Sequence, residues 1–167
     1  MVSWGFQRMC NEWCVYHQVS STGTTIFAVH VDNIMVTSSS IDETLCFRDE
    51  LHLKWEISEL GPASFTLRIA ISRNRSHKTI SLSQTAFINH TIECFNQTNS
   101  HPTKTPIVTS SHLTHPDKSM PISADTIHWM KHTPYRKLIS SLNYLAVTTQ
   151  PDIAYTIGRL ASFLDCY

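Results

Sequence analysis

The sequence predicts an α+β fold in which antiparallel β-hairpins are covered by helices. Apolar and polar residues alternate with period two around residues 24–37 and 65–83, and each of these stretches contains a polar reversal. Apolar residues recur at helical spacing after each stretch, and again beyond residue 134. The chain has 167 residues, 41% of them hydrophobic, which is enough for one domain or two small lobes.

The first hairpin is predicted from the stretch TTIFAVHVDNIMVT, which begins at Thr24. We expect the chain to reverse at Asp32-Asn33, because both residue types tolerate the left-handed conformations of tight hairpin turns. A helix should follow, since Ser40 and Glu43 have the spacing of a capping box. An apolar stripe predicts which side of this helix is buried, and it consists of Ile41, Leu45, Phe47, Leu51 and Trp55.

The second hairpin is predicted after the break at Gly61-Pro62. FTLRIAIS reads as one continuous strand and KTISLS as its partner, with the polar RNRSH between them. A helix from about residue 84 to 95 should follow, with Ser83 as its cap.

Three segments are predicted from these patterns. Residues 1–97 hold the hairpins and their helices, and residues 98–133, rich in Pro, His, Ser and Thr, are expected to be an irregular linker. Residues 134–167 carry two helical stripes, with Pro151 at the start of the second helix, where a missing N–H costs nothing.

The charge balance argues against a free-standing nucleic-acid binder. Lys plus Arg and Asp plus Glu each number 13, so the whole chain lacks the positive field on which phosphate affinity depends. The N-terminus has no apolar signal region, and no run reaches the ~18 apolar residues of a membrane span. We therefore expect an intracellular protein that does not cross a membrane.

Five stretches, in order along the chain, resemble the reverse transcriptase of copia-type LTR retrotransposons. FAVHVDNIMVTSSS is similar to that family's catalytic hairpin, which reads roughly LLVYVDDILVTGSS. The other four are ELGPASFTLRIAIS, ISLSQTAFINHTIECFN, TPI at residues 105–107, and YRKLISSLNYLAVTTQPDIAY. The resemblance runs nearly from end to end, and its last stretch is especially specific.

This resemblance implies a partial polymerase palm followed by a thumb- or connection-like helical segment that leads toward a ribonuclease H domain. It also implies an RNA or DNA template-primer as partner and Mg²⁺ as cofactor. The family's fingers and first palm strand lie upstream of the region that this chain resembles. We therefore expect the strand IFAVHV to lack a neighbour on one side, leaving an unpaired edge.

The resemblance places Asp32 at the first of the family's paired aspartates, as a metal ligand, and Asn33 at the second. Such polymerases use two Mg²⁺ ions about 4 Å apart, held by carboxylates from separate strands. An amide brings no charge, whereas a charge pair at about 4 Å is worth on the order of 4 kcal/mol near a protein surface. We expect Asp32 to be a relic Mg²⁺ ligand in a fragment that is inactive alone. Without the resemblance, Asp32 reads as an ordinary turn residue.

Two further departures from the family pattern are His30, in place of a tyrosine, and Arg68, in place of the glycine of FLGI. Their alternative interpretations are a hydrogen-bonded, half-buried histidine and a cation on the solvated face of an edge strand. A candidate nucleic-acid contact is formed by Lys131, Arg136 and Lys137, which can equally be the solvated face of a helix.

Three hypotheses follow from these observations. The chain is a truncated, degenerate reverse transcriptase fragment, or a repurposed non-catalytic module that binds nucleic acid or protein, or an incomplete gene model of an active polymerase.

Overall fold

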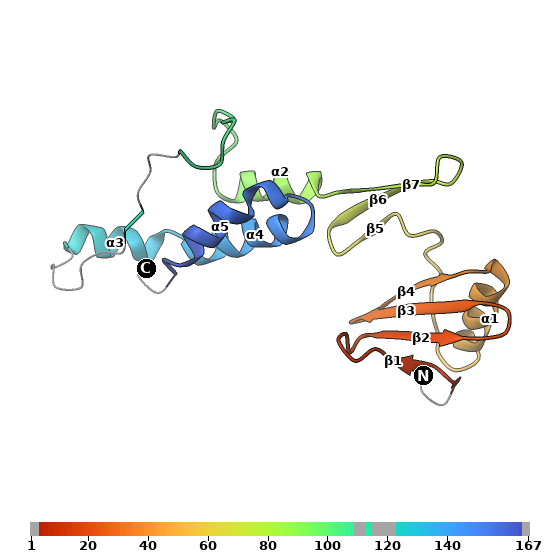
Figure 1. Cartoon of the computed structure of the whole chain (residues 1–167). Coiled ribbons are helices and arrows are strands. Elements are labelled where there is room, and N and C mark those ends of the chain that lie inside the picture. Colours follow the sequence, from red (N-terminus) through yellow and green to blue (C-terminus); the bar gives the residue numbers. More distant parts are fainter. Residues whose placement is uncertain (1–3, 109–112, 115–122, 165–167) are drawn as a thin grey trace. The chain divides into compact units, whose positions relative to one another are not determined.

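The computed structural model describes residues 4–108, 113–114 and 123–164, and it divides the chain into two compact units (Figure 1). The N-terminal unit comprises Met1–Ala63 and the C-terminal unit comprises Ser64–Tyr167. Each is described by itself below.

The N-terminal unit is a four-stranded antiparallel sheet with one helix. The strands follow the order β1-β2-β3-β4, and the helix α1 follows β4 along the chain. Their bounds are β1 Gln7–Arg8, β2 Val15–Val19, β3 Thr24–His30, β4 Asn33–Ser38 and α1 Ile41–His52. The hairpin of β3 and β4 was predicted, whereas β1 and β2 were not, because β1 is only two residues long and β2 has no clear alternation.

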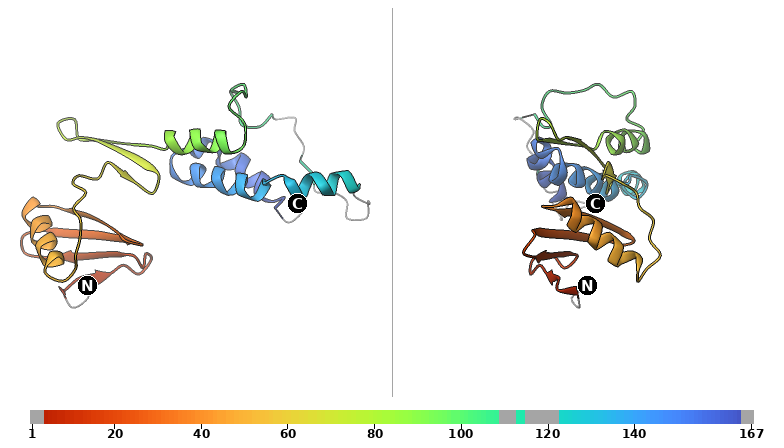
Figure 2. Two further views of the ribbon diagram at one scale, coloured as in Figure 1. Left: turned by 180° about the vertical axis from the view of Figure 1, so that it is seen from behind. Right: turned by 90° about the vertical axis from the view of Figure 1, so that its right-hand side faces the viewer.

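Phe27 is the centre of this unit's core. It pairs with Val36 across the β3–β4 ladder and with Tyr16 across the β2–β3 ladder, so these three side chains share one face of the sheet. Helix α1 covers that face (Figure 2), and its Phe47 and Leu51 side chains are buried against the sheet in the same core as Phe27. The alternation of apolar and polar residues along β3 therefore places Phe27 on the face that helix α1 buries.

Helix α1 differs in two respects from the predicted one. Ser40 caps it as predicted, since the Ser40 Oγ accepts a hydrogen bond from the Asp42 N–H at 3.2 Å. The apolar stripe is only partly buried, because Ile41 and Leu45 are exposed and the helix ends before Trp55.

The sheet is open at β4. The prediction that β3 lacks a neighbour is wrong, because β3 pairs with β2 on one side and with β4 on the other. Within the described residues, β4 pairs only with β3, so its outer backbone groups form the free edge.

The C-terminal unit begins with a three-stranded antiparallel sheet in the order β5-β6-β7 and continues with helices. The bounds are β5 Phe65–Thr66, β6 Ile69–Asn74, β7 Thr79–Ser83, α2 Thr85–Cys94, α3 Ala124–His132, α4 Tyr135–Thr148, a 3₁₀ turn η2 at Pro151–Ile153, and α5 Ala154–Ala161.

A tight turn divides the stretch that was predicted as one strand. Thr66 pairs with Ile69, so Leu67 and Arg68 form a two-residue hairpin loop between β5 and β6. Their φ values are +49° and +62°, and positive φ at both loop residues is the pattern of a type I′ turn. Glycine adopts such φ values without a Cβ penalty, so the arginine at position 68 makes this turn less favourable.

The helices of this unit pack as the apolar stripes predicted. Ile139 and Ala146 of α4 contact Ile157 of α5, and the Tyr135 hydroxyl donates a 2.8 Å hydrogen bond to the Leu160 carbonyl. Helix α2 begins one residue later than predicted, with Gln84 instead of Ser83 at the N-cap.

Helix α3 lies inside residues 98–133, the segment that was expected to be irregular. The Pro, His, Ser and Thr content of the segment around α3 concealed the helix, and its Ile127 is exposed. Part of that segment, residues 109–112 and 115–122, lies outside the described residues. No helix in the described part of the chain is long and apolar enough to cross a bilayer.

The α+β class with antiparallel sheets is thus confirmed.

The variant Phe27→Ala should lower the free energy of unfolding of the N-terminal unit by about 3–5 kcal/mol, because Phe27 is the central aromatic residue of that core and is 0% exposed. Urea unfolding of the full chain, followed by tryptophan fluorescence, measures this loss.

The matched control is Ile41→Ala, since Ile41 is 69% exposed and its truncation should cost under about 0.5 kcal/mol. Equal losses in the two variants would contradict a core centred on Phe27.

Candidate functional site

The tip of the β3–β4 hairpin contains the predicted catalytic residues. His30 pairs with Asn33, so Val31 and Asp32 form the two-residue loop. The predicted reversal at Asp32-Asn33 is therefore wrong by one residue: Asp32 lies in the loop, whereas Asn33 is the first residue of β4. His30 and Asn33 lie on the sheet face opposite Phe27, and all residues of the tip are exposed.

The loop has an unusual backbone conformation at Val31. Its φ is +56°, which is uncommon for any residue with a Cβ and a genuine outlier for a β-branched one. Positive φ at the first of two loop residues is the pattern of a type II′ turn, in which glycine is preferred. Strain of this kind, on the order of 1–3 kcal/mol, persists only where the surrounding structure fixes the backbone. Here the flanking strands fix it and hold Asp32 at the tip.

Glu43 of α1 anchors the other end of the hairpin. Its carboxylate accepts hydrogen bonds from three hydroxyl groups on the β2–β3 turn and on β3, those of Ser20 at 2.5 Å, Thr22 at 2.7 Å and Thr25 at 3.1 Å. The predicted capping box placed Glu43 on its own helix terminus, and the structure instead places it between α1 and the sheet. The helix thus holds β3 by Phe47 at its buried face and by Glu43 at its N-terminal turn.

These hydrogen bonds also affect the titration of Glu43. The hydroxyl of Ser20, followed by that of Thr22, stabilises the carboxylate and lowers the pKa of Glu43 below its ordinary value. The anchor is therefore strongest when Glu43 is ionised.

The residues of the tip supply few ligands for a metal ion. Mg²⁺ is held in proteins by carboxylates together with substrate phosphates. The loop supplies one carboxylate, that of Asp32, and next to it Asn33 supplies a neutral amide. Within the described residues, no three His, Cys, Asp or Glu side chains lie close enough together to hold a metal ion. The tip by itself does not fit a two-metal centre.

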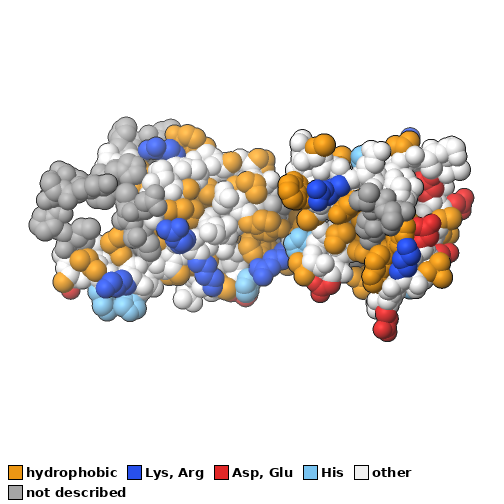
Figure 3. Space-filling view, turned by 90° about the horizontal axis from the view of Figure 1, so that it is seen from below, with side chains coloured by type: hydrophobic (Ala, Val, Ile, Leu, Met, Phe, Trp, Pro, Cys, Tyr) orange, Lys and Arg blue, Asp and Glu red, His pale blue; other side chains and the backbone are white. Residues whose placement is uncertain are grey.

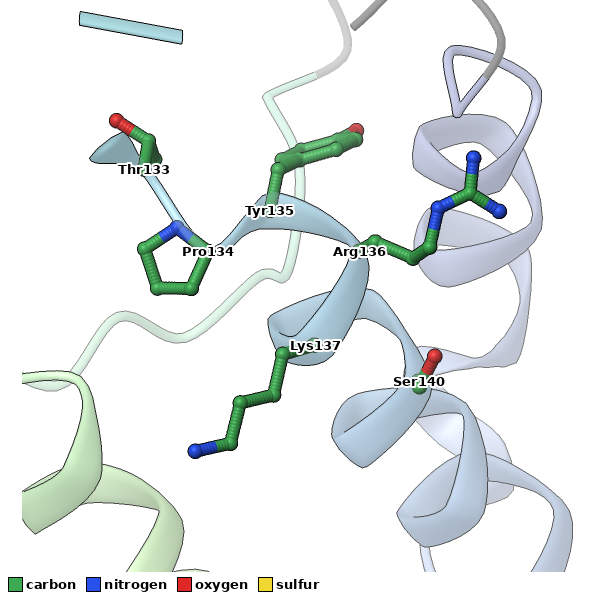
Figure 4. A pocket seen from close by; sticks show the side chains of 6 residues that line it. All are labelled: Thr133, Pro134, Tyr135, Arg136, Lys137 and Ser140. Atoms are coloured by element: carbon green, nitrogen blue, oxygen red, sulfur yellow. The ribbon is translucent and has the colours of Figure 1, made fainter. Parts of the chain in front are cut away.

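The predicted cationic residues lie on two consecutive helices. Lys131 is in the last turn of α3, and Arg136 and Lys137 are in the first turn of α4. Arg136 and Lys137 help to line a surface hollow of about 460 Å³ at the start of α4 (Figure 4), whereas Lys131 does not. Arg136 points toward α5 and donates a 3.3 Å hydrogen bond to the Leu164 carbonyl, whereas Lys137 points to the opposite side. The two cations of the hollow therefore do not point toward one place.

The positions of Arg136 and Lys137 do not stabilise α4. A helix N-terminus carries partial positive charge, so cations in the first turn are unfavourable there, and α4 has no acidic residue in that turn.

The two units carry opposite formal net charges, although the charges of the whole chain balance. Residues 1–63 contain three Lys or Arg and eight Asp or Glu, whereas residues 64–167 contain ten and five. The formal net charges are therefore −5 and +5. One face of the molecule shows the acidic side chains gathered over the N-terminal unit (Figure 3).

Comparison with known proteins gives a consistent result. Residues 1–109 match a family model described as "Reverse transcriptase (RNA-dependent DNA polymerase)". The chain is 29% identical over 166 residues to the Retrovirus-related Pol polyprotein from transposon TNT 1-94 of Nicotiana tabacum, covering 99% of this chain and 12% of that protein. It is 27% identical over 160 residues to the putative transposon Ty5-1 protein YCL074W of Saccharomyces cerevisiae, covering 96% and 49%.

A third relative is the Retrovirus-related Pol polyprotein from transposon RE2 of Arabidopsis thaliana, 28% identical over 137 residues, which are 81% of this chain and 9% of that protein. The chain thus spans half the length or less of each of these relatives. No solved structure matches it significantly.

The anchor at Glu43 predicts a pH dependence of stability. Because the pKa of Glu43 is lowered by folding, its contribution is present above the unfolded-state pKa and is lost as the pH falls through the folded-state value. The wild-type melting temperature should therefore fall more steeply than that of Glu43→Gln between pH 5 and the acid limit of folding. Melting curves across this range, followed by circular dichroism, measure the difference.

The control variant is Glu50→Gln, which removes an exposed carboxylate from the same helix. Identical pH profiles for the wild type and Glu43→Gln would rule out this anchor.

Proposed function

This chain belongs to the reverse transcriptase (RNA-dependent DNA polymerase) family of copia-type retrotransposons, and we propose that residues 1–167 carry the metal-binding hairpin of its palm in a degenerate form. The observation that carries the proposal is the β3–β4 hairpin, whose loop presents Asp32 on a backbone fixed by packed strands. A site of this kind needs such rigid support.

Strand extension by the two-metal mechanism requires carboxylates from more than one strand around the growing primer end. Residues 1–167 supply Asp32 at the hairpin tip, and the neighbouring position is the neutral Asn33. We therefore propose that this chain by itself does not bind Mg²⁺ productively and does not extend a primer. Asp32 retains the position of a ligand without the partners that it needs.

Our assignment of segments is part of the same proposal. Residues 1–97 correspond to the palm with its following hairpin and helix, 98–133 to a connecting segment, and 134–167 to the helical part that leads toward a ribonuclease H domain. An RNA or DNA template-primer is the partner in the family, and we assign none to this chain by itself; an intracellular location is a further prediction.

A second candidate function is non-catalytic binding of nucleic acid. It is favoured by the formal charge of +5 on the C-terminal unit and by Arg136 and Lys137, which occupy a helix N-terminus that disfavours them. An anionic partner at that end of α4 would offset the cost. Lys131, in the last turn of the preceding helix α3, is the third residue of this candidate contact.

A primer-extension assay tests the first proposal. The wild-type chain, incubated with a primed RNA template, dNTPs and either Mg²⁺ or Mn²⁺, should give no templated product, because Asp32 is a lone acid at the tip. Incorporation that disappears in Asp32→Ala would overturn the proposed inactivity.

Asn33→Asp provides a gain-of-charge comparison. A second carboxylate beside Asp32 should strengthen Mn²⁺ binding at the tip several-fold, since carboxylates are the preferred ligands of such ions. Paramagnetic broadening of the backbone NMR signals of residues 30–34 measures this binding. Equal broadening in the wild type, in Asn33→Asp and in Asp32→Ala would contradict the assignment of Asp32 as a relic ligand.

A further inference from the structure

The described cations of the C-terminal unit form no ion pairs with acidic side chains. None of its Lys and Arg residues that the structure describes forms an ion pair, whereas Arg48 in the N-terminal unit pairs with Asp49 at 2.7 Å and with Glu59 at 3.6 Å. Residues 60–92 contain no Asp or Glu at all. They contain four cations, which are Arg68, Arg73, Arg75 and Lys78. Charge in this region is therefore uncompensated.

Two of these cations, Arg75 and Lys78, lie in the loop of the β6–β7 hairpin. Asn74 pairs with Thr79, so residues 75–78 form the loop, and Arg73, one residue before that pair, lies on the face of the ribbon opposite Asn74. The Lys78 N–H donates a 3.3 Å hydrogen bond to the Arg75 carbonyl, so Arg75 and Lys78 are the two ends of one β-turn and their Cα atoms lie within about 7 Å. Both side chains are exposed.

The loop is held in one conformation by Asn74. Its Oδ1 accepts hydrogen bonds from the Ser76 Oγ at 2.7 Å and from the His77 N–H at 3.0 Å. Such a turn reduces the conformational entropy that binding would otherwise cost.

The loop sequence does not favour folding. Arg75 and Lys78 place like charges together, and Lys78 has a φ of +52°, a conformation in which Gly or Asn would be less strained. Two unfavourable features at one exposed tip are explained by a ligand that contacts these side chains.

One face of the hairpin suits a polar ligand. Ser72 faces Ser81, and Asn74 faces Thr79, so small hydrogen-bonding side chains line the same face up to the tip. All four are exposed. A two-stranded ribbon has dimensions that the major groove of B-DNA admits, and hydroxyl and amide side chains are common donors to phosphate.

We propose that the tip of the β6–β7 hairpin, with Arg75 and Lys78, contacts the phosphate backbone of a nucleic-acid duplex without reading its sequence. This inference deepens the second candidate function, since it moves the principal contact from the start of α4 to a separate element of the same unit. Uncompensated charge, a fixed turn and a polar face together favour a polyanion with regularly spaced phosphates.

The test uses the full chain and a fluorescently labelled DNA duplex about two helical turns long. Anisotropy titrations at about 50 and 200 mM salt give the affinity and its salt dependence. The double variant Arg75→Ser/Lys78→Asn should bind about tenfold or more weakly at the lower salt, and the slope of log K against log salt should become shallower by about 2. Asn at position 78 tolerates the positive φ, so the turn is kept.

The matched control is Lys131→Ser/Lys137→Ser, which removes the same charge from the same unit. A much smaller loss in this variant supports the hairpin tip. Equal losses would mean that only the overall charge matters, and a larger loss in the control would return the contact to the start of α4; either result overturns this proposal. So does an absence of binding by the wild type at the lower salt.

Competition identifies the class of partner. Unlabelled duplex of unrelated sequence should displace the probe, whereas polyglutamate of equal charge should do so poorly. Equal displacement by polyglutamate would overturn the assignment to nucleic acid in favour of an acidic polypeptide. The primer-extension assay tests Asp32 and the anisotropy assay tests this tip, so the inactivity proposal and the binding proposal fail independently.

Discussion

The packing of Phe27 against helix α1 is the interaction on which the rest of the N-terminal unit depends. Its ring contacts those of Phe6, Tyr16 and Phe47 at centroid distances of 4.9 Å each. Aromatic pairs at this spacing add to the energy of burial. Because Phe27 lies on β3, three residues before the last pair of the hairpin, the core fixes the register of the strand that carries the tip. A strained loop can persist there because its two strands cannot slip.

The C-terminal unit has its core between helices and not between a helix and a sheet. Its helices α4 and α5 share an aliphatic core, while its sheet is a narrow ribbon with exposed side chains. The Tyr144 hydroxyl of α4 donates a hydrogen bond to the Leu67 carbonyl, in the loop between β5 and β6. Arg68, in the same loop, lies over the ring of Phe87 at 5.3 Å, a cation–π contact that partly offsets the unfavourable backbone conformation at that position.

The sequence was most informative where burial repeats with a fixed period. Strands β3 and β4 and helices α4 and α5 followed from such patterns, because each buries one face. The pattern could not locate the turns: Val31, Leu67 and Arg68 adopt positive φ against their own preferences, and only the pairing of the flanking strands reveals it. Likewise, the spacing of Ser40 and Glu43 predicted a local cap, whereas Glu43 contacts residues that precede it by 18 to 23 positions.

Only part of the candidate site could be predicted from the sequence. Asp32 and Asn33 came from resemblance to a family motif, and the structure separates them into a loop residue and a strand residue. The segregation of charge was readable from the sequence once the boundary at residue 63 was known, since the total conceals it. The turn made by Arg75 and Lys78 needed the hairpin register to become visible.

The free edge of β4 has a practical consequence for anyone who handles this polypeptide. Along Asn33–Ser38, the backbone amides and carbonyls of every second residue point away from β3 and can pair with an extended chain that approaches, including an identical molecule. Such pairing is a bimolecular event, so it accelerates with protein concentration even when every molecule is correctly folded. Dilution should therefore slow this association.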